Sequence, residues 1–95
     1  MIGVIAKLNV KEGMEAEFED VFLTLSDAVR ANEPGCILYQ LCKDDDGNYI
    51  VMEMYESQEA LDAHGKSEHF KAAGAGFAGK MGGPPEISRM GAVTR

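Results

Sequence analysis

Both histidines of this chain lie in one short stretch, at His64 and His69. A histidine side chain takes up or releases a proton near neutral pH, so it can remove the proton of a phenol or an enol under working conditions. We predict that one of the two, or both, serves as a general base. The alternative is that both are partly exposed helix residues, bonded to Asp62, to Glu68 or to water.

Two tyrosines and one glutamate supply further groups that can hold a small molecule. Tyr39 and Tyr55 fall on two predicted strands, and Glu53 lies two residues before Tyr55, on the same strand face. A tyrosine hydroxyl in a dry pocket can stabilise an oxyanion, and a buried carboxyl with a raised pKa can act as a base. We predict catalytic roles for both tyrosines and a substrate-binding role for Glu53, with cross-strand packing as the alternative.

Apolar side chains must surround these polar groups if they form a pocket. Phe22 belongs to the apolar stripe of a long predicted helix, Phe70 follows His69, and Ala6 lies on the apolar side of the first predicted strand. We predict that these three residues contact the substrate. The alternative for the phenylalanines is ordinary core packing.

The same residues do not form a recognisable cofactor or metal site in the sequence. The two histidines are five positions apart with Gly65 between them, which is not the i, i+4 spacing of helical metal sites. No cysteine or carboxylate pattern completes a ligand set, and no G-x-G-x-x-G run is present. We predict no bound cofactor and no metal. Cys36 and Cys42 lie on one predicted strand, too far apart to pair, and are predicted to be inert.

The composition limits the class of protein and partner. A chain of 95 residues forms one domain, 1–95, and its 45% hydrophobic and 26% charged residues are typical of a globular protein. The net charge of −7 argues against nucleic acid as a partner, because phosphate binding needs a cationic surface. No apolar run is long enough to cross a membrane, and the N-terminus lacks the pattern of a signal peptide. We therefore expect a cytoplasmic protein that binds an uncharged or weakly acidic organic molecule.

The hydrophobic periodicity predicts the order β-α-β-β-α-β, with the second helical region broken in two. The expected strands cover 2–10, 36–42, 49–55 and 86–94, and the expected helices 14–31, 57–63 and 68–78. Ser57 and Ser67 can cap the two short helices, and Gly65 is the expected break between them. This order predicts an α+β, ferredoxin-like sandwich, in which helices cover one face of a four-stranded, mostly antiparallel sheet. The glycines of 72–76 allow either close packing on the long helix or a mobile lid.

Both faces of the predicted sheet are largely apolar. A sheet with one face in water normally alternates apolar with polar residues, and this chain has helices for one face only. Ile50, Met52 and Met54 lie on one side of the predicted strand 49–55, and Tyr49, Val51 and Tyr55 on the other. We therefore predict a homodimer that packs sheet against sheet and includes Ile50 and Met52 in its interface.

The motifs along the chain, in order, are Lys11-x-Gly13, Glu33-Pro34-Gly35-Cys36, Tyr39, Glu53-x-Tyr55-x-Ser57, Ala60-Leu61-x-x-His64 and Ser67-x-His69-Phe70. Together they resemble the antibiotic biosynthesis monooxygenase (ABM) domain family, and its small quinol-monooxygenase-like proteins in particular, over essentially the whole chain. The resemblance implies a dimeric α+β barrel and a cofactor-independent reaction of molecular oxygen with a small quinol, phenol or enolisable aromatic. Other members imply two alternatives for the same pocket: a non-catalytic binding or stress-associated dimer, and a proton-transfer isomerase.

Haem degradation, a third activity in the family, is not expected here. The iron-ligating histidine of the haem-degrading members falls at Gly74 of this chain. Their tryptophan falls at His64, and their first-strand asparagine falls near Ala6. All three positions differ, so the resemblance implies no haem.

Overall fold

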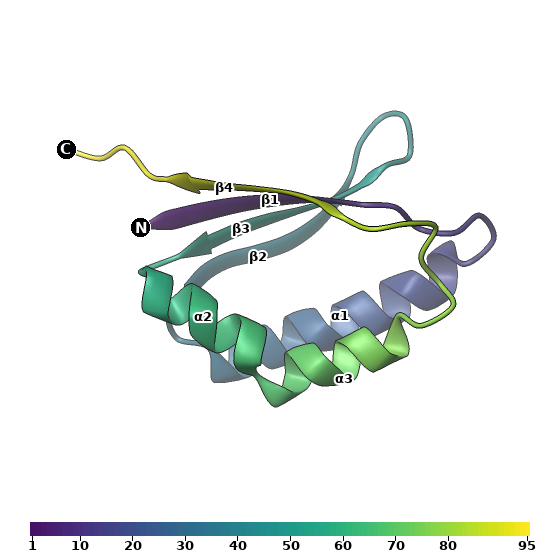
Figure 1. Ribbon diagram of the computed structural model, residues 1–95, viewed down its shortest axis with the longest axis horizontal. Helices are drawn as coiled ribbons and strands as arrows, with labels where there is room; N and C mark the ends of the chain where they lie inside the picture. The colour runs from purple at the N-terminus through teal and green to yellow at the C-terminus, as the bar shows by residue number, and fades with distance from the viewer.

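The protein has two layers, a four-stranded antiparallel sheet and a layer of three helices on one face of that sheet (Figure 1). The computed structural model describes residues 1–95. The elements are, in order, β1 (Ile2–Leu8), α1 (Glu15–Asn32), β2 (Cys36–Lys43), β3 (Tyr49–Tyr55), α2 (Gln58–Lys66), α3 (Glu68–Gly76) and β4 (Glu86–Gly91). The strands lie in the order β2-β3-β1-β4, and all neighbours are antiparallel. The predicted ferredoxin-like α+β fold is confirmed.

The apolar stripe of α1 forms the centre of the core. Phe18, Phe22, Leu25 and Val29 are each at most 3% exposed and pack against the inward face of the sheet. The ring of Phe18 lies 4.8 Å from that of Tyr49 on β3, measured between centroids. Burying a side chain of this size stabilises the fold by roughly 1.5–3 kcal/mol. This packing holds α1 against the sheet.

The predicted serine caps are present at both short helices. Ser57 Oγ accepts a hydrogen bond from the backbone N–H of Ala60, and Ser67 Oγ accepts one from that of Phe70, each at 3.2 Å. Ser67 Oγ also donates to the backbone carbonyl of His64 at 2.7 Å. Ser67 therefore ends α2 and begins α3 at the same residue.

The predicted break at Gly65 is wrong, because α2 continues through Gly65 to Lys66. A glycine costs a helix about 1 kcal/mol relative to alanine, which weakens a helix but does not end it. The extended backbone of Ser67, with φ −69° and ψ 151°, makes the break instead. Other boundaries differ from the prediction by one to three residues; β1, for example, ends at Leu8 and β4 ends at Gly91.

The glycines of α3 divide into two kinds. A Cβ atom placed on Gly76 would lie 2.9 Å from Cγ1 of Val21 on α1, closer than real Cβ contacts come. A Cβ on Gly74 would meet nothing within 4 Å. Gly76 thus permits close packing of α3 on α1, whereas Gly74 has no packing requirement.

The sheet face opposite the helices is uncovered (Figure 1) and apolar at its centre. Cross-strand pairing sets Leu38 beside Met54, and Met52 beside Ile5. The exposed fractions of Leu38, Met52 and Met90 are 42%, 43% and 45%. We call this surface, made by Ile5, Leu38, Ile50, Met52, Met54 and Met90, the outer sheet face.

The inward face of β4 also lacks a helix above it. Ile87 pairs with Ala6 and Arg89 pairs with Val4, so both side chains point to the helix side of the sheet. Ile87 is nevertheless 64% exposed. The helix layer therefore leaves a space next to β4. No helix of the chain has both the length and the apolar character needed to span a membrane.

Candidate functional site

A cavity of about 460 Å³ lies between the helix layer and the inward face of the sheet, next to β4. All four strands and all three helices contribute to its lining, which is mainly apolar. Its size falls in the range of small-molecule sites, which are likewise mostly apolar with a few placed polar groups. The polar side chains that line it are Tyr39, Glu53, His64 and Arg89.

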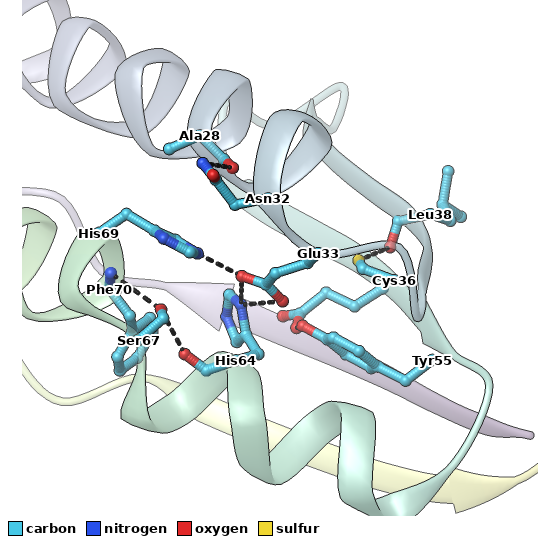
Figure 2. A network of polar contacts seen from close by, with 11 residues as sticks. Ala28, Asn32, Glu33, Cys36, Leu38, Tyr55, His64, Ser67, His69 and Phe70 are labelled. Carbon is cyan, nitrogen blue, oxygen red and sulfur yellow. Dashed lines mark hydrogen bonds and ion pairs between the residues drawn. The ribbon is translucent and has the colours of Figure 1, made fainter.

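His64 is held by a carboxylate at the end of α1. Its Nδ1 atom lies 2.9 Å and 3.1 Å from the two carboxylate oxygens of Glu33 (Figure 2). A carboxylate can only accept hydrogen bonds when ionised, so Nδ1 carries the proton and the lone pair of the neutral ring is on Nε2. The side chains of both residues are nearly buried, with exposed fractions of 6% and 9%.

The Nε2 atom of His64 faces the cavity. It has no hydrogen-bond partner in the protein. Every side-chain nitrogen or oxygen that is fully buried does have a partner, so Nε2 is not fully buried. Nε2 must therefore reach open space, and the open space that His64 borders is the cavity. The result is an unpaired proton acceptor, held in orientation by Glu33, in an apolar surrounding.

His69 contacts the same Glu33 carboxylate from the other side, through its Nε2 atom (Figure 2). Its side chain does not line the cavity; it borders a groove between α1 and α3 and is 18% exposed. The two histidines are thus brought together, as predicted for a shared site, but through a third residue. Only His64 reaches the cavity.

Tyr39 offers the cavity a hydrogen-bond donor. Its ring stacks on Phe22 at 5.4 Å with an angle of 7° between the planes, and lies 5.0 Å from the ring of His64. The hydroxyl has no partner in the protein, and by the same reasoning as for His64 it reaches the cavity. Burial, with the nearby charge of Glu53, raises the pKa of Tyr39 well above its ordinary value. The hydroxyl therefore stays protonated and able to donate.

Glu53 and Tyr55 form a pair, but only Glu53 lines the cavity. The Tyr55 hydroxyl donates to Glu53 Oε1 at 2.6 Å, and the Tyr55 ring is fully buried. Burial raises the pKa of Glu53, although the hydrogen bond from Tyr55 opposes this shift. The structure therefore places Tyr55 behind Glu53, as a residue that positions it, and not at the cavity as expected from the sequence.

The three residues expected to contact a substrate all line the cavity: Ala6, Phe22 and Phe70. The ring centroid of Phe70 lies 4.9 Å from that of His64. Phe70 is 42% exposed, so it covers the site from α3 and also faces out of it. These residues form the apolar wall against which a flat ligand can pack.

Two site residues were not predicted. Glu33 appeared in the sequence analysis only within the Glu33-Pro34-Gly35-Cys36 motif, with no role in the site, and its contacts are with residues 31 and 36 positions away. Arg89 lies on the edge strand β4 and donates from Nε to Gln58 Oε1 at 3.0 Å. A lone arginine in a short C-terminal strand indicates only a solvent-facing position. Arg89 lies two residues after Ile87 on the same strand, and this spacing was the available signal that both side chains share the inward face.

Neither cysteine belongs to the site. Both are free, and Cys36 lies near the start of β2. Burial raises the pKa of Cys36 to about 11, with the charges of Glu33 and Glu53 adding to the effect. A thiol with so high a pKa is a weak nucleophile at neutral pH, in agreement with the prediction that it is inert.

Solved structures support the same fold at several levels of similarity. An antibiotic biosynthesis monooxygenase candidate from Caulobacter crescentus shares 48% identity and a TM-score of 0.94, over 98% of this chain and 90% of that one. A conserved protein from Methanosarcina mazei Go1 shares 26% identity and a TM-score of 0.86, over 94% and 89% of the two chains. A Mycobacterium tuberculosis protein with 23% identity and a TM-score of 0.89, over 99% and 96%, shows the shared fold alone.

No curated protein matches the sequence. The family profile described as antibiotic biosynthesis monooxygenase matches residues 1–76, from β1 to the end of α3. The matched region holds His64, Tyr39 and Glu53, and it includes Glu33. The chain therefore belongs to the antibiotic biosynthesis monooxygenase family.

Proposed function

We propose that this protein is a cofactor-independent monooxygenase that acts on a small quinol, phenol or enolisable aromatic. The observation that carries the proposal is the pair of unpartnered polar atoms, His64 Nε2 and the Tyr39 hydroxyl, that face one mainly apolar cavity. One is a proton acceptor and the other a proton donor, as the formation of a substrate anion requires. Membership of a monooxygenase family supports the choice of oxygen as the second reactant.

In the proposed reaction, His64 Nε2 takes the proton of the substrate hydroxyl or enol. The imidazolium that forms is stabilised by the Glu33 carboxylate at Nδ1. Tyr39 donates a hydrogen bond to the developing oxyanion. Glu53 lines the same cavity, where burial raises the pKa of its carboxyl above the ordinary value.

The substrate anion is then electron-rich enough to reduce molecular oxygen itself. One electron passes to O₂, and recombination of the two radicals forms a carbon–oxygen bond to a peroxide. The proton held on His64 passes to the peroxide, the O–O bond breaks, and loss of water leaves a carbonyl. A CH₂ group plus O₂ thus gives a C=O group plus water, so the reaction needs no external electron donor. The apolar walls shield the anion from bulk water.

Oxygen uptake with a panel of quinols and anthrones tests the proposal. The assay contains EDTA and no flavin or haem, and we expect uptake with at least one member of the panel and one carbonyl formed per O₂ consumed. Tyr39→Phe should lower the rate, because it removes the donor and keeps the ring. Glu59→Gln, on the exposed side of α2, is the matched control and should leave the rate unchanged. Binding without oxygen uptake would favour the non-catalytic alternative, and exchange of substrate protons without uptake would favour the isomerase.

The outer sheet face supports a second proposal, that two copies of this chain pack sheet against sheet. Leu38, Met52 and Met90 are contiguous through the strand pairing and carry no charge. Apolar patches of this kind are rarely left in water by monomers. A two-fold axis closes such a self-complementary patch, and a stable dimer would bury at least about 1,200 Å² in total.

A further inference from the structure

Three side chains from three helix ends converge on one point beside the cavity. Glu33 follows α1, His64 lies in the last turn of α2, and His69 lies in the first turn of α3 (Figure 2). One nitrogen from each histidine and one carboxylate oxygen all lie within 4.8 Å of one another. No lysine or arginine pairs with the Glu33 carboxylate, whose ion-pair partners are the two histidines.

This set of donors is one that binds divalent transition metals. Imidazole nitrogens and carboxylate oxygens bind Zn²⁺ at about 2.0–2.2 Å, so neighbouring donors around a tetrahedral ion lie roughly 3.4 Å apart. His64 Nδ1 and a Glu33 oxygen are 2.9 Å apart without an ion, so a modest separation of the side chains would admit one. We infer that Glu33, His64 and His69 form a binding site for a divalent transition-metal ion, with Zn²⁺ as the best-fitting common ion.

The site is built by structure that holds the ligands in place. Ser67 joins α2 to α3 and bonds to the carbonyl of His64, so the two histidines cannot swing apart freely. The side chains of Glu33 and His64 are nearly buried, whereas His69 is more exposed and borders the groove between α1 and α3. An ion can therefore enter from the His69 side and need not pass through the cavity. The sequence analysis predicted no metal. It did not find this site because Glu33, which completes the ligand set, lies 31 positions before His64.

Metal binding at this point would change what His64 presents to the cavity. An ion needs the lone pair of Nδ1, so the proton of the neutral ring must move to Nε2. Nε2 then faces the cavity as a donor and no longer as a base. Zn²⁺ at this site should therefore inhibit oxygenation; this consequence rests on the proposed function, whereas the binding itself does not.

Calorimetric titration of EDTA-treated protein with ZnCl₂ tests the binding. We expect one saturable site per chain, with affinity reduced about tenfold or more in Glu33→Gln and in His69→Ala. Glu68→Gln, an exposed carboxylate beside His69, is the control and should bind as the wild type does. Absence of saturable binding up to about 1 mM Zn²⁺, or unchanged affinity in both ligand variants, would overturn the inference.

A second measurement separates ligation from a merely structural role of these residues. Co²⁺ in place of Zn²⁺ should give a visible absorption band that titrates with one equivalent and changes in His69→Ala, with circular dichroism showing that the variant is folded. A Co²⁺ spectrum identical in wild type and in folded His69→Ala would count against the site. Where the protein takes up oxygen, Zn²⁺ should slow the wild type and EDTA should restore it, while His69→Ala should resist Zn²⁺ at whatever rate it retains. Binding without any oxygenase activity would support the site and refute only the proposed function.

Discussion

The Nδ1 atom of His64 lies 2.9 Å from a carboxylate oxygen of Glu33, although 31 positions separate the two residues in the sequence. This contact fixes which ring nitrogen carries the proton, and so which one faces the cavity. It also makes the carboxylate part of any proton transfer that His64 performs. Glu33 is a positioning residue in this scheme, because it acts on the substrate only through His64.

The first prediction concerns the proposed base. His64→Asn should lower kcat by roughly 10²–10⁴, the usual effect of losing a general base. The expected effect of Glu33→Gln is smaller, because His64 remains but its tautomer is no longer enforced and its protonated form is no longer stabilised. The measurement is the rate of oxygen uptake as a function of pH for the wild type and both variants. We expect the pH of maximal activity to differ between Glu33→Gln and the wild type. Full activity of His64→Asn would remove the proposed base.

The second prediction concerns the pH dependence of stability at Glu53. Burial raises the pKa of Glu53 in the folded protein above the ordinary value of 4.5. As the pH rises past that value, the unfolded chain releases the proton and the folded protein keeps it, so ionisation favours unfolding. The contribution of Glu53 to the free energy of unfolding should therefore fall from about pH 4.5 upward, until the folded pKa is passed.

Glu53→Gln should lack this fall, because glutamine does not ionise. Urea unfolding of both proteins at one protein concentration, from pH 4 to pH 8, measures the effect as variant minus wild type. We expect that difference to increase in favour of the variant as the pH rises above about 4.5. A difference that is constant or that decreases over this range would contradict the raised pKa.

The third prediction separates the two glycines of α3. Gly76→Ala should destabilise the protein by about 1–2 kcal/mol, because its Cβ would lie 2.9 Å from Cγ1 of Val21, a β-branched side chain with little freedom to move. Gly74→Ala should instead stabilise it by up to about 1 kcal/mol, since alanine favours the helix and the position is open. Thermal unfolding should show opposite shifts of several degrees. Equal shifts would mean that α3 does not pack closely on α1.

The fourth prediction concerns the outer sheet face. Met52 lies at its centre, paired with Ile5 on one side and Gln40 on the other. Met52→Lys should give a monomer or an insoluble protein, because a lysine charge cannot be buried there without a partner. Leu23→Lys is the matched control, since Leu23 is 50% exposed on α1, away from that face, and the dimer should persist.

Light scattering at micromolar concentration distinguishes the outcomes. A wild-type protein that is monomeric under these conditions would refute the proposed sheet-against-sheet pairing. Loss of the dimer in Leu23→Lys as well would indicate that the interface lies elsewhere.

The sequence allowed the element order and the six lining residues Ala6, Phe22, Tyr39, Glu53, His64 and Phe70 to be predicted. The period of the apolar residues predicted α1 and the four strands, and strand parity placed Glu53 and Tyr55 on one face of the third strand. The helix caps at Ser57 and Ser67 followed from residue type alone. These features depend on local spacing, which a sequence shows directly.

The features that could not be predicted depend on how elements meet in space. Tyr55 and Glu53 share a strand face by parity, but only the packing above β3 decides that Tyr55 is covered and Glu53 is not. Glu33 becomes part of the site because α1 ends where α2 meets α3, which no spacing within one segment indicates. Gly65 remained helical because the rest of α2 outweighed its low propensity.

Ser67 is the single residue between α2, which ends at Lys66, and α3, which begins at Glu68. The geometry of the site therefore depends on the number of residues at this junction as well as on their types. One residue added after Ser67 would turn the rest of α3 by about 100° around its axis, given 3.6 residues per turn. His69 would then point away from Glu33, and Phe70 away from the cavity, even though no side chain had been replaced. Insertions and deletions at this junction should therefore be far less tolerated than in the β2–β3 loop, which extends away from the helix layer (Figure 1).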